Sequence, residues 1–169
     1  MNKESKVYKK YRVIRRKYIE FKRSVKSKMK IPFYPFLAVR FLYEQWKLGH
    51  APSLDMLMFQ TDSPLERMLY YELRYFYKGQ IAPQHPLGPY WIDFAIPKHK
   101  LALECDGYPY HSSEKARLHD RNRDAYMKRV GWKVMRFTYK DLCKENIAQT
   151  MQQIHDYTMR ATPKQKKAN

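Results

Sequence analysis

Carboxylates and one histidine recur through the middle of this 169-residue chain at spacings that could organise hydrolytic chemistry. Asp93 lies inside the apolar stretch 90–96, and Glu104 follows the apolar residues 101–103. Both stretches alternate partly and read as short strands. A carboxylate inside an apolar strand is costly to bury unless it is paired or holds a metal ion. Because two acids on neighbouring strands can share one hard divalent cation, the pattern predicts a Mg²⁺ or Mn²⁺ site at Asp93 and Glu104.

These residues also have plainer structural interpretations. Asp93 and Glu104 could pair with basic side chains from the charged segment 113–130 instead of holding a metal. His111 follows Gly107, where a loop could bring its imidazole over the acids. With an unperturbed pKa near about 6.5, histidine can take a proton from water or give one to a leaving oxygen. A histidine on a surface loop remains the alternative.

Four further charged residues belong to the same candidate site. Glu66 stands at the third position of a Ser-Pro helix start, where it could close a capping box or line the site. Asp120 and Arg123 share one helix face. They could form a surface pair, or Asp120 could orient the histidine while Arg123 steadies a phosphate or a carboxylate. Asp106 could be a third ligand, a partner of the histidine or a turn residue.

The chain is strongly basic, with a formal net charge of +18 at pH 7, and the first 30 residues hold 13 Lys/Arg against two Asp/Glu. Such an excess favours phosphate-rich partners through counterion release, with an anionic membrane surface as the rival partner. We expect a phosphate-rich partner to be held, mostly through its phosphates, by basic residues of the N-terminal segment, which are Lys9, Lys10, Arg12, Arg15, Arg16 and Lys17.

Cysteine content and hydropathy exclude several other classes of protein. Two cysteines, Cys105 and Cys143, are too few for a structural zinc site and form no Cys-x-x-Cys pair, so we expect no zinc. Their use is typical of a reducing, intracellular compartment. No apolar run is long enough for a membrane span, and none follows the basic N-terminus as a signal-peptide core. We therefore expect a cytoplasmic protein that does not enter a membrane.

Hydrophobic periodicity predicts a basic helical extension over 1–62, a compact α/β domain over 63–160 and a loose basic tail over 161–169. Apolar residues at alternating spacings of three and four run along a helix at 3–29. This stripe could pack on the domain or on a partner helix, or the segment could fold on nucleic acid. Further helices are expected at 36–48, 63–77, 113–130 and 146–160, and strands at 80–85, 89–96, 100–106 and 132–137.

Six short motifs follow one another in a fixed order. They are Ser63-Pro64-Leu65-Glu66, Asp93-Phe94, Glu104-Cys105-Asp106-Gly107, His111, Asp120-Arg121-Asn122-Arg123 and the strand Gly131 to Phe137. This set resembles the PD-(D/E)XK nuclease superfamily, in its very-short-patch-repair-like branch. Within that branch it is similar to the phage-associated homing endonucleases named for an E-D-x-H-D site and to related uncharacterised bacterial domains. The resemblance covers about residues 63–155.

The resemblance implies a restriction-endonuclease-like αβββαβα core with a mixed sheet, in a prokaryotic or phage-infected cell. It makes Glu104 the acidic partner of Asp93. The motif lysine of the wider superfamily is replaced by Asp106, and the zinc-ligand cysteines of true very-short-patch repair enzymes are absent. The E, D, H and D of the site would be Glu66, Asp93, His111 and Asp120.

The sequence thus predicts a divalent-metal-dependent DNA endonuclease that nicks DNA or cuts both strands. A homodimer or a protein partner would be needed to cut both strands in one binding event. One rival is a non-catalytic nucleic-acid-binding scaffold, since a fold does not fix a function. The other is a nuclease subunit whose target is chosen by a partner in a mobile-element or defence complex.

Overall fold

The computed structural model describes residues 3–107 and 114–160. The chain divides into two compact units, unit 1 over Met1–Gln60 and unit 2 over Thr61–Asn169. Unit 2 contains helix α3 (Pro64–Phe76), strands β1 (Ala82–Leu87), β2 (Tyr90–Ile96) and β3 (Leu101–Cys105), helix α4 (Glu114–Arg129), strand β4 (Lys133–Phe137), and helices α5 (Tyr139–Leu142) and α6 (Ile147–Arg160). The described helices include none that is both long and apolar enough to cross a membrane.

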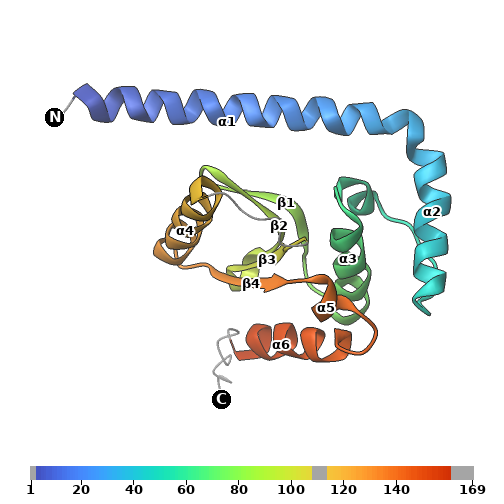
Figure 1. The fold of residues 1–169 in the computed structure, drawn as a ribbon. Coiled ribbons are helices and arrows are strands. Elements are labelled where there is room, and N and C mark those ends of the chain that lie inside the picture. Colours follow the sequence, from blue (N-terminus) through green and yellow to red (C-terminus); the bar gives the residue numbers. More distant parts are fainter. Residues whose placement is uncertain (1–2, 108–113, 161–169) are drawn as a thin grey trace, which may run out of the picture. The chain divides into compact units, whose positions relative to one another are not determined.

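The four strands form one mixed sheet in the order β1-β2-β3-β4. β1 and β2 form an antiparallel pair, as do β2 and β3, because short turns connect them. β3 and β4 are parallel, so the chain must cross over between them, and α4 forms that crossover. Figure 1 shows α4 on one side of the sheet and α3 on the other.

The core of unit 2 lies on both faces of the central strands β2 and β3. Phe94 is fully buried and stacks on Tyr70 of α3, with 5.7 Å between ring centroids. On the α4 side, Ile92, Ala102 and Met127 form a buried cluster. Because β2 and β3 are covered on both faces, polar side chains on them are costly to bury unless they find partners.

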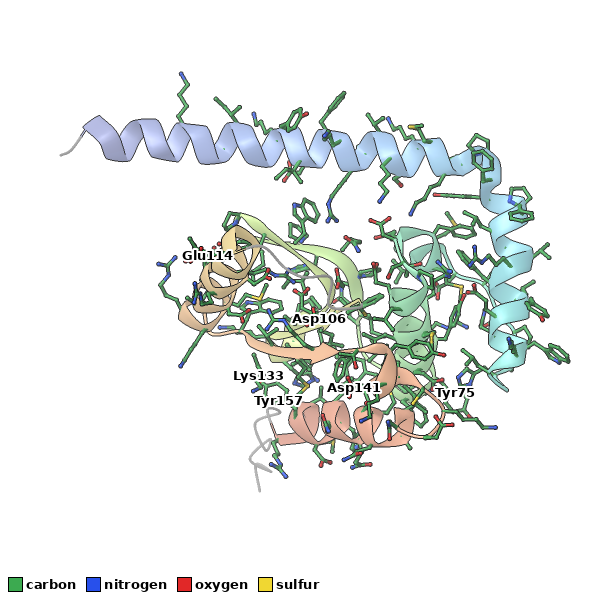
Figure 2. All side chains as sticks on the ribbon, in the orientation of Figure 1. Tyr75, Asp106, Glu114, Lys133, Asp141 and Tyr157 are labelled. Carbon is green, nitrogen blue, oxygen red and sulfur yellow. The ribbon has the colours of Figure 1, made fainter. Side chains whose placement is uncertain are left out.

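The predicted site residues gather where the end of β3 lies beside the middle of β2. Figure 2 shows Asp106, directly after β3, inside unit 2, whereas Tyr75 near the end of α3 lies apart from it. Asp93 is on β2, and Glu104 is the penultimate residue of β3. The β2–β3 register pairs Phe94 with Leu103, and one further step along it places Asp93 opposite Glu104.

The helix and strand order agrees with the sequence-based expectation, with one addition and one shift. The one-turn helix α5 was not expected; a capping box between Thr138 and Asp141 stabilises it. β1 begins at Ala82 and runs to Leu87, two residues later than predicted at each end. The predicted break after the first helix is a single 3-10 turn, η1 (Ile31–Phe33).

Unit 1 consists of two helices and a short aromatic core. Its elements are α1 (Lys3–Lys30), η1, α2 (Tyr34–Lys47) and a second 3-10 helix, η2 (Met56–Gln60). Phe59 of η2 stacks on Tyr34 and lies tilted against Phe41, with centroid distances of 4.2 and 5.2 Å. The buried Gln45 side chain donates hydrogen bonds to the carbonyl oxygens of Phe41 and Ser53, which ties α2 to the following connector.

Candidate functional site

A cavity of about 870 Å³ opens beside the middle of β2 and the end of β3. The first turn of α3 and the start of α5 form its other walls. Among the described residues, three carboxylates face it, from Glu66, Asp93 and Asp106. The described residues that line it are Ser63, Pro64, Leu65, Glu66, Met68, Asp93, Cys105, Asp106, Gly107, Thr138, Tyr139 and Lys140.

Asp93 is fixed by the strand beside it. Its Oδ2 accepts a hydrogen bond from the backbone N–H of Cys105 at 2.8 Å. The pKa of Asp93 is raised, first by burial and further by the negative charges of Glu66 and Asp106, against lowering by the Cys105 N–H and Arg123. Burial also raises the pKa of the Cys105 thiol well above its ordinary value, so that side chain stays a neutral thiol.

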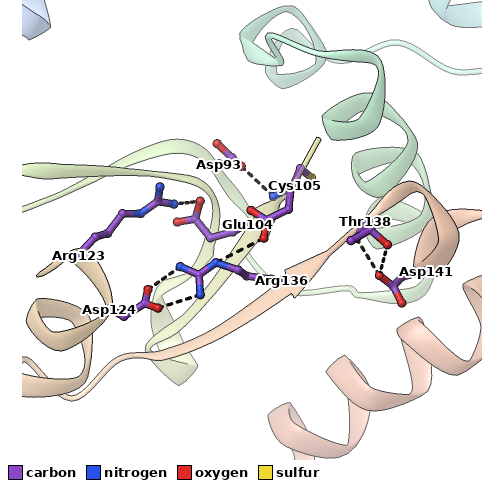
Figure 3. A network of polar contacts seen from close by, with 9 residues as sticks. Asp93, Glu104, Cys105, Arg123, Asp124, Arg136, Thr138 and Asp141 are labelled. Carbon is purple, nitrogen blue, oxygen red and sulfur yellow. Dashed lines mark hydrogen bonds and ion pairs between the residues drawn. The ribbon is translucent and has the colours of Figure 1, made fainter. Parts of the chain in front are cut away.

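Glu104 is the most deeply buried acid of the site, at 2% exposed. Its Oε2 forms an ion pair with Arg123 of α4 (Figure 3). Its Oε1 is buried and has no hydrogen-bond partner among the described residues. Arg123 has a lowered pKa because its guanidinium is desolvated. The α4 helix therefore places one cation against one oxygen of Glu104 and leaves the other oxygen available.

Glu66 is held at the start of α3 by neutral groups. The Ser63 hydroxyl caps the helix by accepting the Glu66 N–H at 3.1 Å. The Glu66 Oε2 accepts two hydrogen bonds of 2.9 Å, from the backbone N–H of Asp62 and from the side-chain amide of Gln84. The carboxylate thus bonds to the residue before the cap and to β1, and it faces the cavity while 7% exposed.

Asp106 belongs to a network that joins β3, β4 and α4 (Figure 3). Arg136 on β4 donates to both carboxylate oxygens of Asp124 on α4 and lies 3.6 Å from Asp106 Oδ2 through its Nε. The pKa of Asp106 is raised by burial and by the charges of Asp120 and Asp124, against lowering by Arg136. Asp120 is exposed on α4 and acts on this network through its charge.

Several predicted residues lie wholly or partly outside the described residues. His111 lies in the undescribed segment 108–113. The basic residues of α1 belong to a described helix, in which Lys10 and Lys17 are exposed. The side chains of the other four residues predicted to bind DNA lie outside the description, namely those of Lys9, Arg12, Arg15 and Arg16.

Three features of the site were missed by sequence reasoning. Thr138-x-x-Asp141 is a readable capping-box pattern, and it would have located α5 and with it Tyr139 at the cavity. From the sequence, Arg136 could be recognised only as one residue of an alternating strand, and its contacts with Asp124 and Asp106 could not be inferred. Gln84 gave no signal, because neither its left-handed backbone (φ 50°) nor its bond to Glu66 can be inferred from local sequence.

The donor set of the cavity suits a hard divalent cation. Carboxylate oxygens are the ligands that Mg²⁺ prefers, and the ion commonly uses only one or two protein carboxylates together with water. Burial, and after it the negative charges of Glu66 and Asp106, raise the pKa of Asp93, and a cation would relieve that repulsion. Glu104 has an oxygen without a partner among the described residues. Within the described ranges, no three His, Cys, Asp or Glu side chains form a ready-made metal cluster.

Comparison with known proteins agrees with this architecture. Over 77 residues, or 45% of this chain, the sequence is 31% identical to the uncharacterized protein YcjD of Escherichia coli (strain K12), and this match spans 63% of that curated relative. The solved structure of the Homing Endonuclease I-Bth0305I Catalytic Domain superposes with a TM-score of 0.50 at 20% identity, over 60% of this chain and 100% of that one. This likeness confirms the predicted mixed α/β fold.

A third match is to the REase_MTES_1575 family, and it covers residues 66–157, from the first turn of α3 almost to the end of α6. It therefore includes the whole sheet, α4 and the carboxylates that face the cavity. It also confirms the resemblance on which the sequence-based prediction was built. Since the match takes in more than half of the 169 residues, the chain belongs to the REase_MTES_1575 family of restriction-endonuclease-like domains.

Proposed function

We propose that this protein is a Mg²⁺- or Mn²⁺-dependent DNA endonuclease that hydrolyses phosphodiester bonds at the cavity of unit 2. The observation that carries the proposal is the convergence of Glu66, Asp93 and Asp106 on one cavity in a restriction-endonuclease-like domain. The fold shared with a homing endonuclease catalytic domain supports the same reaction class. The basic α1 supports a polyanionic substrate.

Asp93 and Glu104 remain the residues that we propose to hold the cation, with Glu66 and Asp106 beside them. Such an ion would supply positive charge against the phosphate and would acidify a water molecule. Arg123 neutralises part of the charge on Glu104, and Arg136 restrains Asp106 and the α4 helix. These two arginines offset the repulsion among the neighbouring acids, in a protein that we propose binds an anionic substrate.

Hydrolysis then requires one proton to leave the attacking water and one to reach the leaving oxygen. The water oxygen bonds to phosphorus while the bond from phosphorus to one sugar oxygen breaks, and that oxygen leaves as a hydroxyl. His111 is our proposed proton carrier, as the sequence predicts, because imidazole can do both transfers near neutral pH. Asp120, on the helix that follows, is proposed to orient it.

We propose that DNA is also contacted at the mouth of the cavity, by Tyr139 and Lys140. The Tyr139 ring is 62% exposed and stands next to the carboxylates. α5 is held rigidly, since the Thr138 N–H and hydroxyl both donate to Asp141, and Asn146 donates to the Lys140 carbonyl. A fixed, exposed ring beside the cleaved phosphate is suited to stacking on a base or sugar.

Replacing Tyr139 with alanine should weaken DNA binding and raise KM by roughly fivefold to 150-fold, since stacking of one base on an aromatic ring contributes about 1–3 kcal/mol. Fluorescence anisotropy with a labelled duplex and initial cleavage rates measure the two effects. Tyr75→Ala is the matched control, because Tyr75 is 59% exposed but is not among the residues that line the cavity, and Figure 2 shows it apart from Asp106. Equal losses in both variants would contradict a specific contact at Tyr139.

The function itself is tested by incubating supercoiled plasmid with the purified protein in Mg²⁺ or Mn²⁺. We expect nicked or linear product, complete suppression by EDTA, recovery when excess Mg²⁺ is restored, and loss of most activity in His111→Ala. Anisotropy run in parallel shows whether each sample still binds DNA. A wild-type protein that binds DNA but cuts no plasmid with either metal would overturn the endonuclease proposal in favour of a scaffold.

A nuclease directed by a protein partner is the second candidate, and unit 1 favours it. One face of α2 exposes Phe36, Val39, Tyr43 and Trp46, each at least 59% accessible, at alternating spacings of three and four. The opposite face is buried through Phe41 and Gln45. An apolar helix stripe of this kind is typical of surfaces that bind another helix. Weak, unselective cleavage by the isolated protein would agree with this candidate.

A further inference from the structure

Two acids of the cavity region have partners that differ in charge. Glu104 forms an ion pair with Arg123, so much of its charge is neutralised within the protein. Glu66 receives its hydrogen bonds from a backbone N–H and a side-chain amide, both of which are neutral. Neither donor carries a positive charge, so they leave the carboxylate at the cavity available to a cation.

The two hydrogen bonds also fix the orientation of the carboxylate. Both converge on Oε2, from Asp62 N–H and Gln84 Nε2, each at 2.9 Å. The amide of Gln84 comes from β1 and the N–H of Asp62 from the segment before α3, so they clamp Oε2 from two elements. Neither of these bonds uses Oε1, and we expect that oxygen to meet a ligand at the cavity.

Gln84 makes this bond from a strained backbone conformation. Its φ is +50°, in the left-handed region that costs a residue with a side chain about 1–2 kcal/mol. β1 pairs Pro83 with Phe94 and His85 with Ile92, so Gln84 stands across from Asp93 in the same register. A glycine would meet the backbone requirement without strain, and residues held in such conformations cluster at functional sites.

We propose that Gln84 is a positioning residue that orients Glu66 as a ligand for the divalent cation. This inference rests on the proposed function, since it concerns the same cation, and it adds an acid from α3 to Asp93, which lines the same cavity. A lysine or arginine at position 84 would instead form an ion pair with Glu66 and compete with the metal.

The test measures Mn²⁺ affinity by electron paramagnetic resonance and thermal stability in EDTA, with no DNA present. In Gln84→Gly we expect Mn²⁺ affinity to fall about 10- to 100-fold, as is typical when a group that orients a metal ligand is lost. The Tm should be maintained or raised by a few degrees, because relief of the strain offsets the lost hydrogen bond. Gln84→Lys should lower Mn²⁺ affinity as well, because the new lysine would form an ion pair with Glu66. The same ion pair should prevent a loss of Tm.

Lys100→Gly is the matched control, because Lys100 is the other described non-glycine residue with positive φ, at 47°, in the turn between β2 and β3. It should raise the Tm and leave Mn²⁺ affinity within twofold of wild type. Mn²⁺ affinity unchanged in both Gln84 variants, or a wild-type protein that binds no Mn²⁺, would overturn the inference. If wild type binds Mn²⁺, both Gln84 variants bind it weakly and no DNA is cut, the inference stands and the endonuclease proposal fails.

Discussion

Replacing Asp93 with asparagine should lower the rate of DNA cleavage by roughly 10³-fold or more while the protein remains folded. Loss of a carboxylate ligand removes several kcal/mol of charge stabilisation from the transition state, and each 1.4 kcal/mol or so is a factor of ten in rate. The amide side chain of the Asp93→Asn variant would keep an oxygen that can accept the Cys105 N–H. Initial rates of plasmid nicking at saturating Mg²⁺ measure the loss.

The same variant should be at least as stable as wild type at neutral pH in EDTA. The pKa of Asp93 is raised in the folded state, mainly by burial, so the folded protein favours the protonated acid. The stability that this group contributes is therefore present at low pH and is lost as the pH rises through the raised pKa. The Tm difference between Asp93→Asn and wild type should accordingly grow between acidic and neutral pH.

Asp156→Asn provides the matched control for both measurements. Asp156 lies on α6, accepts a hydrogen bond from Gln152 and does not line the cavity. The control should retain wild-type cleavage. An Asp93→Asn protein that is folded, binds DNA and cuts within tenfold of the wild-type rate would remove Asp93 from the proposed site.

Replacing Arg123 with methionine should destabilise unit 2 by about 3–5 kcal/mol, because it leaves the Glu104 carboxylate buried without its cation. The Glu104 side chain is 3% exposed in the ion pair, and its Oε1 already has no hydrogen-bond partner among the described residues. Chemical denaturation in EDTA measures the change. Arg121→Met is the control, since Arg121 is an exposed arginine of the same helix, and it should change stability little.

Two further measurements identify the cause of that loss. Adding Glu104→Gln to Arg123→Met removes the unpaired charge and should recover most of the lost stability, which a double-mutant cycle measures as a coupling energy. Millimolar Mg²⁺ should raise the Tm of Arg123→Met more than that of wild type, because a bound cation stabilises the folded state and replaces the missing positive charge. A loss below about 1 kcal/mol in Arg123→Met would contradict the ion pair.

Much of unit 2 could be predicted from the sequence because its signals are local. Ser63-Pro64 starts a helix wherever it occurs before an amphipathic run, and the hydroxyl caps α3 as expected. The alternation in 133–137 gives β4, and the apolar residues of β2 and β3 give the buried centre of the sheet. A one-turn helix such as α5 escapes period-based reasoning because it is shorter than the pattern that would reveal it.

The candidate acids were also identifiable from sequence, since a carboxylate in an apolar strand is costly and therefore conspicuous. Their partners were not. Sequence reasoning left Glu104 open between a metal and a basic residue of the next helix, and the structure pairs it with Arg123. For Glu66, a capping box was expected as the plain alternative, yet its carboxylate bonds to Asp62 and to Gln84.

The sequence by itself determined which residue types stand at the ends of which strands, and with them the family resemblance. Only the tertiary structure decided the partner of each acid. Glu104 forms an ion pair with an arginine of α4, and Glu66 accepts hydrogen bonds from neutral donors on β1 and the segment before α3. The physical reason is that propensity and periodicity act within a few residues. The ion pair of Glu104 with Arg123 joins residues 19 positions apart, and the hydrogen bond of Gln84 to Glu66 joins residues 18 positions apart. Both contacts depend on how the helices pack beside the sheet.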